Sequence, residues 1–315
     1  MSDISAKFIV VLGPNPAWQK TLFFKELITG EVNRAYAMNS FPSGKGINFA
    51  RASSVWGKNH TLLLQFAGGY TGKLICDGLE AEGIRHSTVA VDHITRTCTT
   101  CLCQTTNKMT ELIEPSHAVD PTAVGKMLDI IRKNIKNCLG IALCGTLPGG
   151  TDMKLYIEAA RLAGTYGIPL LIDSWQGIEQ VLKNAENSIL KINLDELRQI
   201  TGVNSPREAT LSVLNNFRLK AVAITDGPGN AYSASADKFH VYKLKKLDHI
   251  VNPLGSGDTA AAVFFSEYLN DKPLTEAFAS GLAAASANCL TPLCGHFELP
   301  AVLQIRNEIT ISEQS

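Results

Sequence analysis

Short runs of apolar, often β-branched residues alternate with longer helical stretches along most of the chain. The short runs are almost continuously hydrophobic, which is typical of strands covered on both faces. The longer stretches that follow them predict helices. Such alternation indicates βαβ units around a mostly parallel sheet, an α/β fold. We predict strands at 7–12, 61–66, 140–145, 168–173, 187–193 and 219–225, and helices at 46–56, 71–83, 151–164 and 256–269, with one further helix ending at Val181.

Two stretches, at about residues 20–42 and 88–113, break this alternation. Both are strand-like, alternate polar and apolar residues, and have no helix between their strands. We interpret them as a small extra sheet over one end of the main sheet. Ligands of open α/β sheets bind beyond the carboxyl ends of the strands, so a cover there would act as a lid. No repeat or long linker interrupts the chain, which predicts a single domain over 1–315 with the lid strands inserted.

Length and charge limit the classes of function. The chain has 315 residues, of which 45% are hydrophobic, so it can bury a large core without metals or disulfides. Its 29 Lys and Arg residues balance 29 Asp and Glu residues, which leaves no overall positive field to gather nucleic acid. The apolar run between Lys7 and Gly13 is too short for a signal peptide or a membrane span. We therefore expect a small-molecule partner, no nucleic-acid or membrane partner, and a cytoplasmic location.

Eight cysteines raise the question of a metal or disulfide site. Nothing directs the chain to an oxidising compartment, so we expect reduced thiols. The spacing of Cys98, Cys101 and Cys103 resembles a metal clip, but the threonines around it predict a strand. Side chains alternate along a strand, so Cys98 would face opposite to Cys101 and Cys103. We interpret the three as small, partly buried hydrophobic residues.

The segment Asn252-Pro-Leu-Gly-Ser-Gly-Asp-Thr259 precedes a strongly apolar helix. Small residues at a helix start expose backbone N–H groups, and the helix dipole adds positive potential, so the segment predicts a cradle for a phosphoryl group. Asp258 would then be a catalytic base, or else a residue that caps the helix. Neither a P-loop nor a strand-linked G-x-G-x-x-G occurs, which disfavours the more familiar nucleotide folds.

Residues 255–258, Gly-Ser-Gly-Asp, resemble the C-terminal signature of the ribokinase-like (PfkB-type) carbohydrate kinases. Residues 42–52, PSGKGINFARA, resemble the glycine motif of the same family. Further segments resemble the family and occur along the chain in the family's order, at 15–17, 31–34, 95–96, 145–148, 191–196 and 225–228. The resemblance covers nearly the whole chain. It implies a three-layer α/β sandwich around a mostly parallel sheet with a small β-sheet lid. It also implies an ATP-dependent phosphotransferase that uses Mg²⁺.

Within this family the chain is most similar to the hexose-phosphate branch, that of 1-phosphofructokinase and tagatose-6-phosphate kinase. GEVNR, TELIEP and NPLGSGD carry the likeness, together with the lysine of SGKGIN and the arginine of TR. The branch implies a ketohexose monophosphate as substrate, either fructose 1-phosphate or tagatose 6-phosphate. A substrate that already carries a phosphate needs fixed cations, and Lys45 and Arg96 would supply a point charge and a forked donor.

The resemblance also implies individual roles. Asp258 would take the proton of the attacking hydroxyl, and the backbone N–H groups of Gly255, Ser256 and Gly257 would stabilise the transferring group. The implied sugar-binding residues are Asn15, Gln19, Gly44, Lys45, Asn48, Arg96 and Thr146. The implied nucleotide-binding residues are Lys191, Asn193, Thr225, Gly227, Asn230, Asn288 and Gly295, with Glu196 helping to place Mg²⁺. Asn193 and Glu196 also fit a helix N-cap followed by a first-turn acid, and Asn288 fits a helix end.

Three positions depart from the family pattern. Gln19 stands where the family's NPA-x-D places an aspartate that grips sugar hydroxyls, and we expect it to face the cleft. Ser43 and Asn230 replace glycines; Asn tolerates left-handed backbone, and Ser43 would be strained only at positive φ.

Two other functions remain open at this point. One is a kinase of an unphosphorylated sugar or nucleoside on the same fold, against which Lys45 and Arg96 argue. The other is a non-catalytic ligand sensor, against which the intact Gly-Ser-Gly-Asp argues. Exposed edges of the lid would suit a homodimer.

Overall fold

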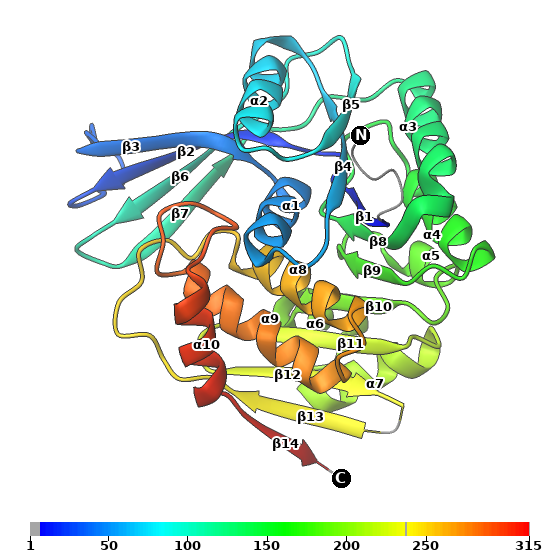
Figure 1. The fold of residues 1–315 in the computed structure, drawn as a ribbon. Coiled ribbons are helices and arrows are strands. Elements are labelled where there is room, and N and C mark those ends of the chain that lie inside the picture. The colour runs from blue at the N-terminus through cyan, green and yellow to red at the C-terminus, as the bar shows by residue number, and fades with distance from the viewer. Residues whose placement is uncertain (1–6, 237, 315) are drawn as a thin grey trace.

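The computed structural model describes residues 7–236 and 238–314 and contains two β-sheets (Figure 1). Every neighbouring pair from β11 to β5 in the larger sheet is parallel, whereas β12, β13 and β14 extend it antiparallel. This confirms the predicted mostly parallel sheet, although the antiparallel extension was not anticipated. The order across the larger sheet is β14 (Thr310–Gln314), β13 (Lys238–Lys243), β12 (Asn230–Ser235), β11 (Ala221–Asp226), β10 (Ile189–Asn193), β9 (Leu170–Asp173), β8 (Cys138–Cys144), β1 (Phe8–Leu12), β4 (Thr61–Ala67) and β5 (His86–Ala90).

Helices cover both faces of this sheet, so the molecule has three layers (Figure 1). Alternate residues of one strand serve the two faces: Ile9 and Val11 pack against one helical layer, and Val10 and Leu12 against the other. The first layer contains α1 (Lys45–Trp56), α2 (Gly69–Ala81), α8 (Ser256–Leu269), α9 (Leu274–Asn288) and α10 (Leu299–Glu308). The second contains α3 (Pro121–Asn134), α4 (Lys154–Thr165), α5 (Glu179–Leu182), α6 (Leu194–Thr201) and α7 (Pro206–Asn216), with a 3₁₀ turn at Ile135–Asn137.

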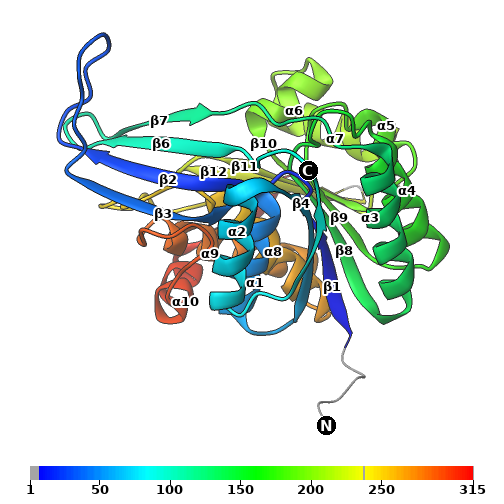
Figure 2. The same cartoon turned by 90° about the horizontal axis from the view of Figure 1, so that it is seen from above.

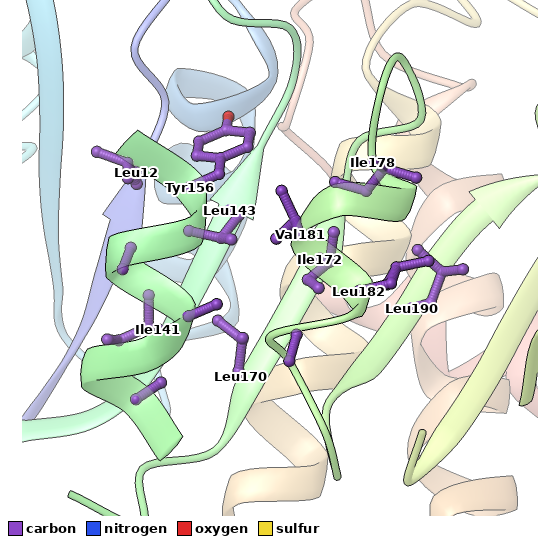
Figure 3. Packing of buried hydrophobic residues seen from close by; sticks show 14 of the residues in the cluster. Leu12, Ile141, Leu143, Tyr156, Leu170, Ile172, Ile178, Val181, Leu182 and Leu190 are labelled. Atoms are coloured by element: carbon purple, nitrogen blue, oxygen red, sulfur yellow. The ribbon is translucent and has the colours of Figure 1, made fainter. Parts of the chain in front are cut away.

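Helices of the second layer hold the strands β8, β9 and β10 in place through apolar packing. Leu143, Ile172 and Leu190 rise from three neighbouring strands and meet Tyr156 of α4 and Val181 of α5 (Figure 3). All five side chains are fully buried, and burial of one such side chain stabilises the fold by about 1.5–3 kcal/mol. The strand ends are therefore held by a rigid apolar layer.

The smaller sheet is the predicted lid, and it extends sideways from one end of the main sheet (Figure 2). Its strand order is β3 (Ala37–Ser43), β2 (Ala17–Phe24), β6 (Thr97–Cys103) and β7 (Lys108–Ile113). One predicted boundary is wrong: residues 88–90 belong to β5, which pairs in parallel with β4 in the main sheet. Because β5 is an edge strand and only partly covered, its sequence alternates like that of a lid strand.

The lid cysteines lie on a strand, as predicted. Cys101 and Cys103 are buried in β6, Cys98 is half-buried, and all are free thiols. Within residues 7–236 and 238–314, His, Cys, Asp and Glu side chains form no group of three or more that could hold a metal ion. In the same residues, no helix has both the length and the apolar character needed to cross a membrane.

Candidate active site

The carboxyl ends of β1 and β8 open into a cavity of about 110 Å³ at the edge of the main sheet. This is where ligands bind in open α/β sheets, because the chain leaves successive strands in different directions there. Five of the residues predicted to bind sugar line the cavity: Asn15, Gly44, Lys45, Arg96 and Thr146. The first turn of α1 forms one wall.

Gly44 shapes this wall because it is the N-cap of α1. Its φ of 121° lies in a region that side-chain-bearing residues rarely adopt, so glycine is required there. The neighbouring Ser43, which replaces a family glycine, is not among the described residues with positive φ. Its hydroxyl instead donates a hydrogen bond of 3.2 Å to Asn48 Oδ1. The departure at this position is therefore accommodated without backbone strain.

The start of α8 forms the predicted cradle. Gly255, the N-cap, has φ of 78°, and a Cβ there would lie only 2.8 Å from Cys294 Cβ, so glycine is required twice over. Lys191 Nζ lies 3.1 Å from the position that a Cβ on Gly257 would take. The Ser256 N–H already donates to the Pro253 carbonyl at 3.3 Å. Of the three N–H groups predicted to form the cradle, that of Ser256 is therefore engaged within the loop, whereas the helix dipole and the Lys191 ammonium group beside Gly257 still suit an anion.

Asp258 lies in the first turn of α8 and is 8% exposed. Its Oδ2 accepts a hydrogen bond of 2.8 Å from Asn48 Nδ2 on α1. The carboxylate is therefore held by a side chain from another helix. Burial, reinforced by the charge of Asp173, raises the pKa of Asp258 to about 6, while Lys45, Asn48 and Lys191 oppose the rise. A carboxylate with this pKa is ionised at neutral pH and still basic enough to accept a proton.

A second buried carboxylate, Asp173 at the end of β9, was missed by sequence reasoning. Its Oδ1 lies 2.6 Å from Lys45 Nζ, and its Oδ2 lies 3.5 Å from Lys191 Nζ. Burial alone would raise the pKa of Asp173, but the two lysines outweigh it and lower the pKa. The available signal was an acid directly after a buried strand, at the edge where ligands bind.

Lys45 lines the cavity, as predicted, and its ammonium group is also held by carboxylates. It bonds to Asp173 and lies 3.9 Å from Glu196 Oε1, beside the residues that surround Asp258. The contact with the phosphate of the sugar that the resemblance implies stays a prediction.

Arg96 presents a cation in the same cavity. Its Nη2 donates to the Asn15 carbonyl at 3.1 Å and its Nε to the Pro16 carbonyl at 3.5 Å. Both partners are neutral carbonyl oxygens, so the guanidinium retains its full charge. The Asn15 amide donates in turn to Thr146 Oγ1 at 3.2 Å and to Ser116 Oγ at 3.4 Å, which joins three segments around the cavity.

Gln19 does not lie where the prediction placed it. The side chain is 4% exposed, and its Nε2 donates to Thr100 Oγ1 at 2.8 Å and to the Lys20 carbonyl at 3.1 Å. It is not among the residues that line the cavity. The physical reason is the alternation along β2, whose buried positions include Gln19, where an amide must find its hydrogen bonds inside the lid.

A second cavity, of about 310 Å³, lies beside the cradle. Thr225 and Gly227 line it, as predicted for a nucleotide site, together with Ser256 and Gly257 of the cradle. Most of its wall is apolar, as expected of a pocket for a flat base. The other lining residues are Pro228, Leu244, Lys245, Lys246, Leu247, Ile250, Pro253, Leu282, Ala285, Ser286 and Cys289.

Five residues predicted to bind the nucleotide do not line this cavity: Lys191, Asn193, Asn230, Asn288 and Gly295. Asn230 begins β12 and pairs with Asp226. Asn288 is fully buried: its Oδ1 accepts from the Gly295 N–H at 2.7 Å, and its Nδ2 donates to the Leu254 carbonyl at 3.1 Å. Asn288 and Gly295 therefore hold two loops together, which corrects the predicted direct contact with the nucleotide.

Asn193 and Glu196 form a capping box at the start of α6. Asn193 Oδ1 accepts from the Glu196 N–H at 2.8 Å, and Glu196 Oε2 accepts from the Asn193 N–H at 2.9 Å. The helix N-cap with a first-turn acid, which the sequence also predicted for these two residues, is therefore present. Glu196 Oε1 lies 3.9 Å from Lys45 Nζ at the site, and a carboxylate oxygen is a donor that suits Mg²⁺, which keeps several waters and binds through one or two carboxylates and nucleotide phosphates.

Comparisons with known proteins bear on the family and on the fold. A model of the pfkB family of carbohydrate kinases matches residues 9–301. Tagatose-6-phosphate kinase of Staphylococcus epidermidis is 25% identical over 312 residues, covering 97% of this chain and 99% of that protein. A protein described as a possible 1-phosphofructokinase from Thermotoga maritima has a TM-score of 0.85 at 20% identity, with 98% of this chain and 100% of the other covered. Phosphofructokinase-2 of Escherichia coli, in complex with substrates and products, has a TM-score of 0.85 at 21% identity, covering 96% and 99%.

Proposed function

Because the chain belongs to the pfkB family of carbohydrate kinases, we propose that it transfers the γ-phosphoryl group of ATP to a ketohexose monophosphate. The observation that carries this proposal is Arg96, a cation in the smaller cavity whose hydrogen-bond partners, in the part of the chain that the structure describes, are neutral carbonyl oxygens. Such a guanidinium recognises a phosphate through two parallel hydrogen bonds. Fructose 1-phosphate and tagatose 6-phosphate are the candidate substrates, the latter also because the chain resembles a tagatose-6-phosphate kinase.

In the proposed reaction Asp258 accepts the proton of the sugar hydroxyl while the hydroxyl oxygen forms its bond to the γ-phosphorus. The bond between that phosphorus and the oxygen shared with the β-phosphate breaks, and ADP leaves. The sugar would occupy the cavity of about 110 Å³ and the adenine the apolar cavity of about 310 Å³, whose lining includes Ser256 and Gly257 of the cradle.

The cationic groups stabilise the charge that spreads over the transferring phosphoryl group. Lys45 and Lys191 are held by Asp173, and Lys191 faces Gly257 of the cradle. Fixed cations and N–H groups in a buried site act without reorganising, which makes them effective in the transition state. Glu196 would help to hold Mg²⁺, whose contribution when bound is to neutralise phosphate charge.

A kinase of an unphosphorylated sugar remains the second candidate, and the cation of Arg96 in the cavity argues against it. Gln19 is the residue that suggests a non-catalytic sensor, because it replaces the family's sugar-gripping aspartate and is bonded inside the lid. A sensor without catalysis is disfavoured, because Asp258, Asn48 and the cradle are intact and connected.

The lid suggests a homodimer as the functional unit. Tyr36, Met38, Leu112 and Ile113 expose 57–59% of their surfaces on the lid strands and the loop before them. These residues lie at the two opposite edges of the lid sheet, β3 and β7. Exposed sheet edges with apolar side chains favour pairing, and a second copy of the same sheet is a matched partner.

The test of the proposed function is a coupled assay for ADP release with ATP and Mg²⁺. The sugars are fructose 1-phosphate, fructose 6-phosphate, tagatose 6-phosphate, free fructose, free tagatose and ribose. We expect kcat/KM for one of the ketohexose monophosphates to exceed that for any free sugar by at least about 10-fold, the effect of one lost charged hydrogen bond. A free sugar that is used as well as its phosphate would replace the proposal with the second candidate.

A further inference from the structure

Arg51 lies on α1, is 4% exposed, and makes an unusually complete set of hydrogen bonds for a buried cation. Its Nε and Nη2 donate to the two carboxylate oxygens of Glu82 at 2.6 and 2.9 Å. Its Nη2 also donates to the Pro42 carbonyl, and its Nη1 to the Cys294 carbonyl, both at 2.8 Å. One guanidinium thus joins the lid strand β3, the end of α2 and the loop that follows α9.

The same guanidinium reaches the catalytic centre through Asn48. Arg51 Nη1 lies 3.4 Å from Asn48 Oδ1, which also accepts from Ser43 Oγ at 3.2 Å. With its oxygen held by two donors, the Asn48 amide must turn its NH₂ group the other way, and that group donates to Asp258 Oδ2 at 2.8 Å. Arg51 therefore contributes to fixing the orientation of the amide that holds Asp258.

The contact with Cys294 reaches the other side of the cradle. Cys294 packs so closely on Gly255 that a Cβ on the glycine would lie 2.8 Å from Cys294 Cβ. The next residue, Gly295, donates its N–H to Asn288, which in turn bonds to the Leu254 carbonyl at the start of the cradle. Arg51 thus supports both the carboxylate and the loop against which the cradle rests.

We infer that Arg51 is a positioning residue for phosphoryl transfer: it keeps Asp258 in register with the cradle and ties both to the lid strand β3. The inference rests on the proposed function, in which Asp258 is the base. The planar guanidinium is essential to this role, because its fork bonds Glu82 with two nitrogens while the third reaches Cys294 and Asn48. Lysine carries the same charge but presents a single nitrogen, so it cannot span these partners.

The molecule supplies a matched control at the other end of α1. Glu267 is 5% exposed and bonds to Lys58 at 2.6 Å and to Trp56 Nε1 at 3.1 Å. The Glu267–Lys58 pair, like the pair of Arg51 with Glu82, joins one buried group to one partly exposed group, and Lys58 lies just after α1. These hydrogen bonds of Glu267 do not lead to Asp258. Glu267→Gln is therefore expected to reduce stability and leave kcat unchanged.

The experiment compares Arg51→Lys, Arg51→Met, Glu82→Gln and Glu267→Gln by steady-state kinetics and by thermal unfolding. We expect both Arg51 variants to lose kcat by about 10- to 100-fold, the scale of a misplaced catalytic group, with KM for ATP changed by less than about threefold. Arg51→Lys should fail to restore kcat.

Arg51 variants that lose as much thermal stability as Glu267→Gln but keep kcat would overturn the inference. Should the Arg51 variants not fold, Glu82→Gln decides, because it removes only the partner's charge: a loss of kcat supports the inference and an unchanged kcat overturns it.

A pH profile separates positioning from a general loss of structure. The groups that face Asp258 are Asp173, Lys45, Lys191 and Asn48, of which Asn48 alone depends on Arg51. If the amide of Asn48 turns away, the acidic limb of kcat/KM should move to higher pH in the Arg51 variants and stay in place in Glu267→Gln. Asp258→Asn distinguishes a failure of the proposed function from a failure of this inference. If Asp258→Asn retains activity, the proposed base is wrong. If Asp258→Asn is inactive while the Arg51 variants keep normal kcat and a normal pH profile, only the inference about Arg51 is overturned.

Discussion

The ammonium nitrogen of Lys45 lies 2.6 Å from Oδ1 of Asp173, and the carboxylate is almost fully buried. Lys191 approaches the other oxygen of Asp173, so one acid supports two cations beside the cradle. Glu196 Oε1, 3.9 Å from Lys45 Nζ, adds a second acid, so carboxylates hold the two ammonium groups in place. In a kinase such fixed cations have a ready use, since the transferring phosphoryl group is anionic.

The first prediction concerns the stability of this cluster. Asp173→Asn leaves two lysines facing a neutral amide in a buried site, and we expect the free energy of unfolding at pH 7 to fall by about 3–5 kcal/mol. Urea unfolding measures the change. Asp195→Asn is the control, because Asp195 is 84% exposed in its ion pair with Arg198, and its loss should cost less than about 1 kcal/mol. Equal urea midpoints for wild type and Asp173→Asn would show that the cluster is not stabilised by this carboxylate.

The second prediction separates the two cations of the sugar cavity. Arg96→Ala should lower kcat/KM for the phosphorylated sugar by about 1.5–3 kcal/mol, the value of a charged hydrogen bond, and leave a free sugar unaffected. Lys45→Ala should lower kcat for both sugars, since its charge is directed by Asp173 toward the cradle. Kinetics with one sugar and its phosphate measure both effects. A selective loss of the phosphorylated sugar in Lys45→Ala would assign Lys45 the role implied by the family resemblance.

The third prediction concerns the activity of Asp258. Asp258→Asn should keep ATP binding and reduce kcat by about 10²–10⁴, the usual contribution of a positioned acid or base. In the wild type, kcat/KM should fall below a pH of about 6, where burial places the pKa of the carboxyl group. Near-normal kcat in Asp258→Asn, or a flat profile between pH 5 and about 7, would reduce Asp258 to a structural residue of α8.

The fourth prediction concerns the stability cost of the same carboxylate. The pKa of Asp258 in the folded state, about 6, lies above its ordinary value of 3.8. Protonation of this carboxyl group therefore stabilises the folded state fully when the pH is below 3.8, and this stabilisation is lost as the pH rises through about 6. Asp258→Asn carries no such cost. Its free energy of unfolding, relative to wild type, should therefore increase between pH 4 and pH 7, by an amount on the order of 2–3 kcal/mol. Urea unfolding of both proteins at the two pH values tests this, and a constant difference would contradict it.

Sequence reasoning could locate the elements and motifs because they are local. The strands and helices follow from apolar runs, and the Gly-Ser-Gly-Asp segment followed by an apolar helix identifies the cradle without any tertiary information. Cavity residues such as Asn15 and Arg96 could be named because they lie within motifs.

The rest depended on contacts between distant segments. Asp173 carries no motif, and its importance arises only when β9 brings it beside lysines from β10 and α1. Asn288 matched a family position, but its hydrogen bonds to Leu254 and Gly295 show a clamp that sequence could not distinguish from a ligand contact. The β5 boundary failed because an edge strand and a lid strand share the same polar alternation.

The lid supplies a prediction about assembly. If a second copy covers the exposed apolar residues, Leu112→Glu combined with Ile113→Glu should convert a dimer to a monomer, because like charges would face each other across a symmetric interface. Sedimentation equilibrium measures the mass. Leu303→Glu on α10 is the control, since Leu303 is 64% exposed and lies away from the lid strands. A monomeric wild type would remove the proposal of a homodimer.

The last prediction concerns Gln19, where this chain departs from its family. The amide of Gln19 is bonded to Thr100 Oγ1 on the neighbouring strand β6, so its place is between two lid strands. Gln19→Asp shortens the side chain, withdraws the donor from the Lys20 carbonyl and puts a charge at a position that is 4% exposed. A buried polar group that loses its partner costs about 1–3 kcal/mol, so we expect the variant to be less stable by about that amount.

Because the residue does not line the sugar cavity, the ratios of kcat/KM among fructose 1-phosphate, fructose 6-phosphate and tagatose 6-phosphate should stay within about threefold of wild type, well below the discrimination of a hydroxyl-reading contact. Thr100→Val, which removes the same bond from the other side, should lower stability in the same way. A shift of the substrate ratios by an order of magnitude in Gln19→Asp, with none in Thr100→Val, would instead place Gln19 in contact with the sugar when substrate binds.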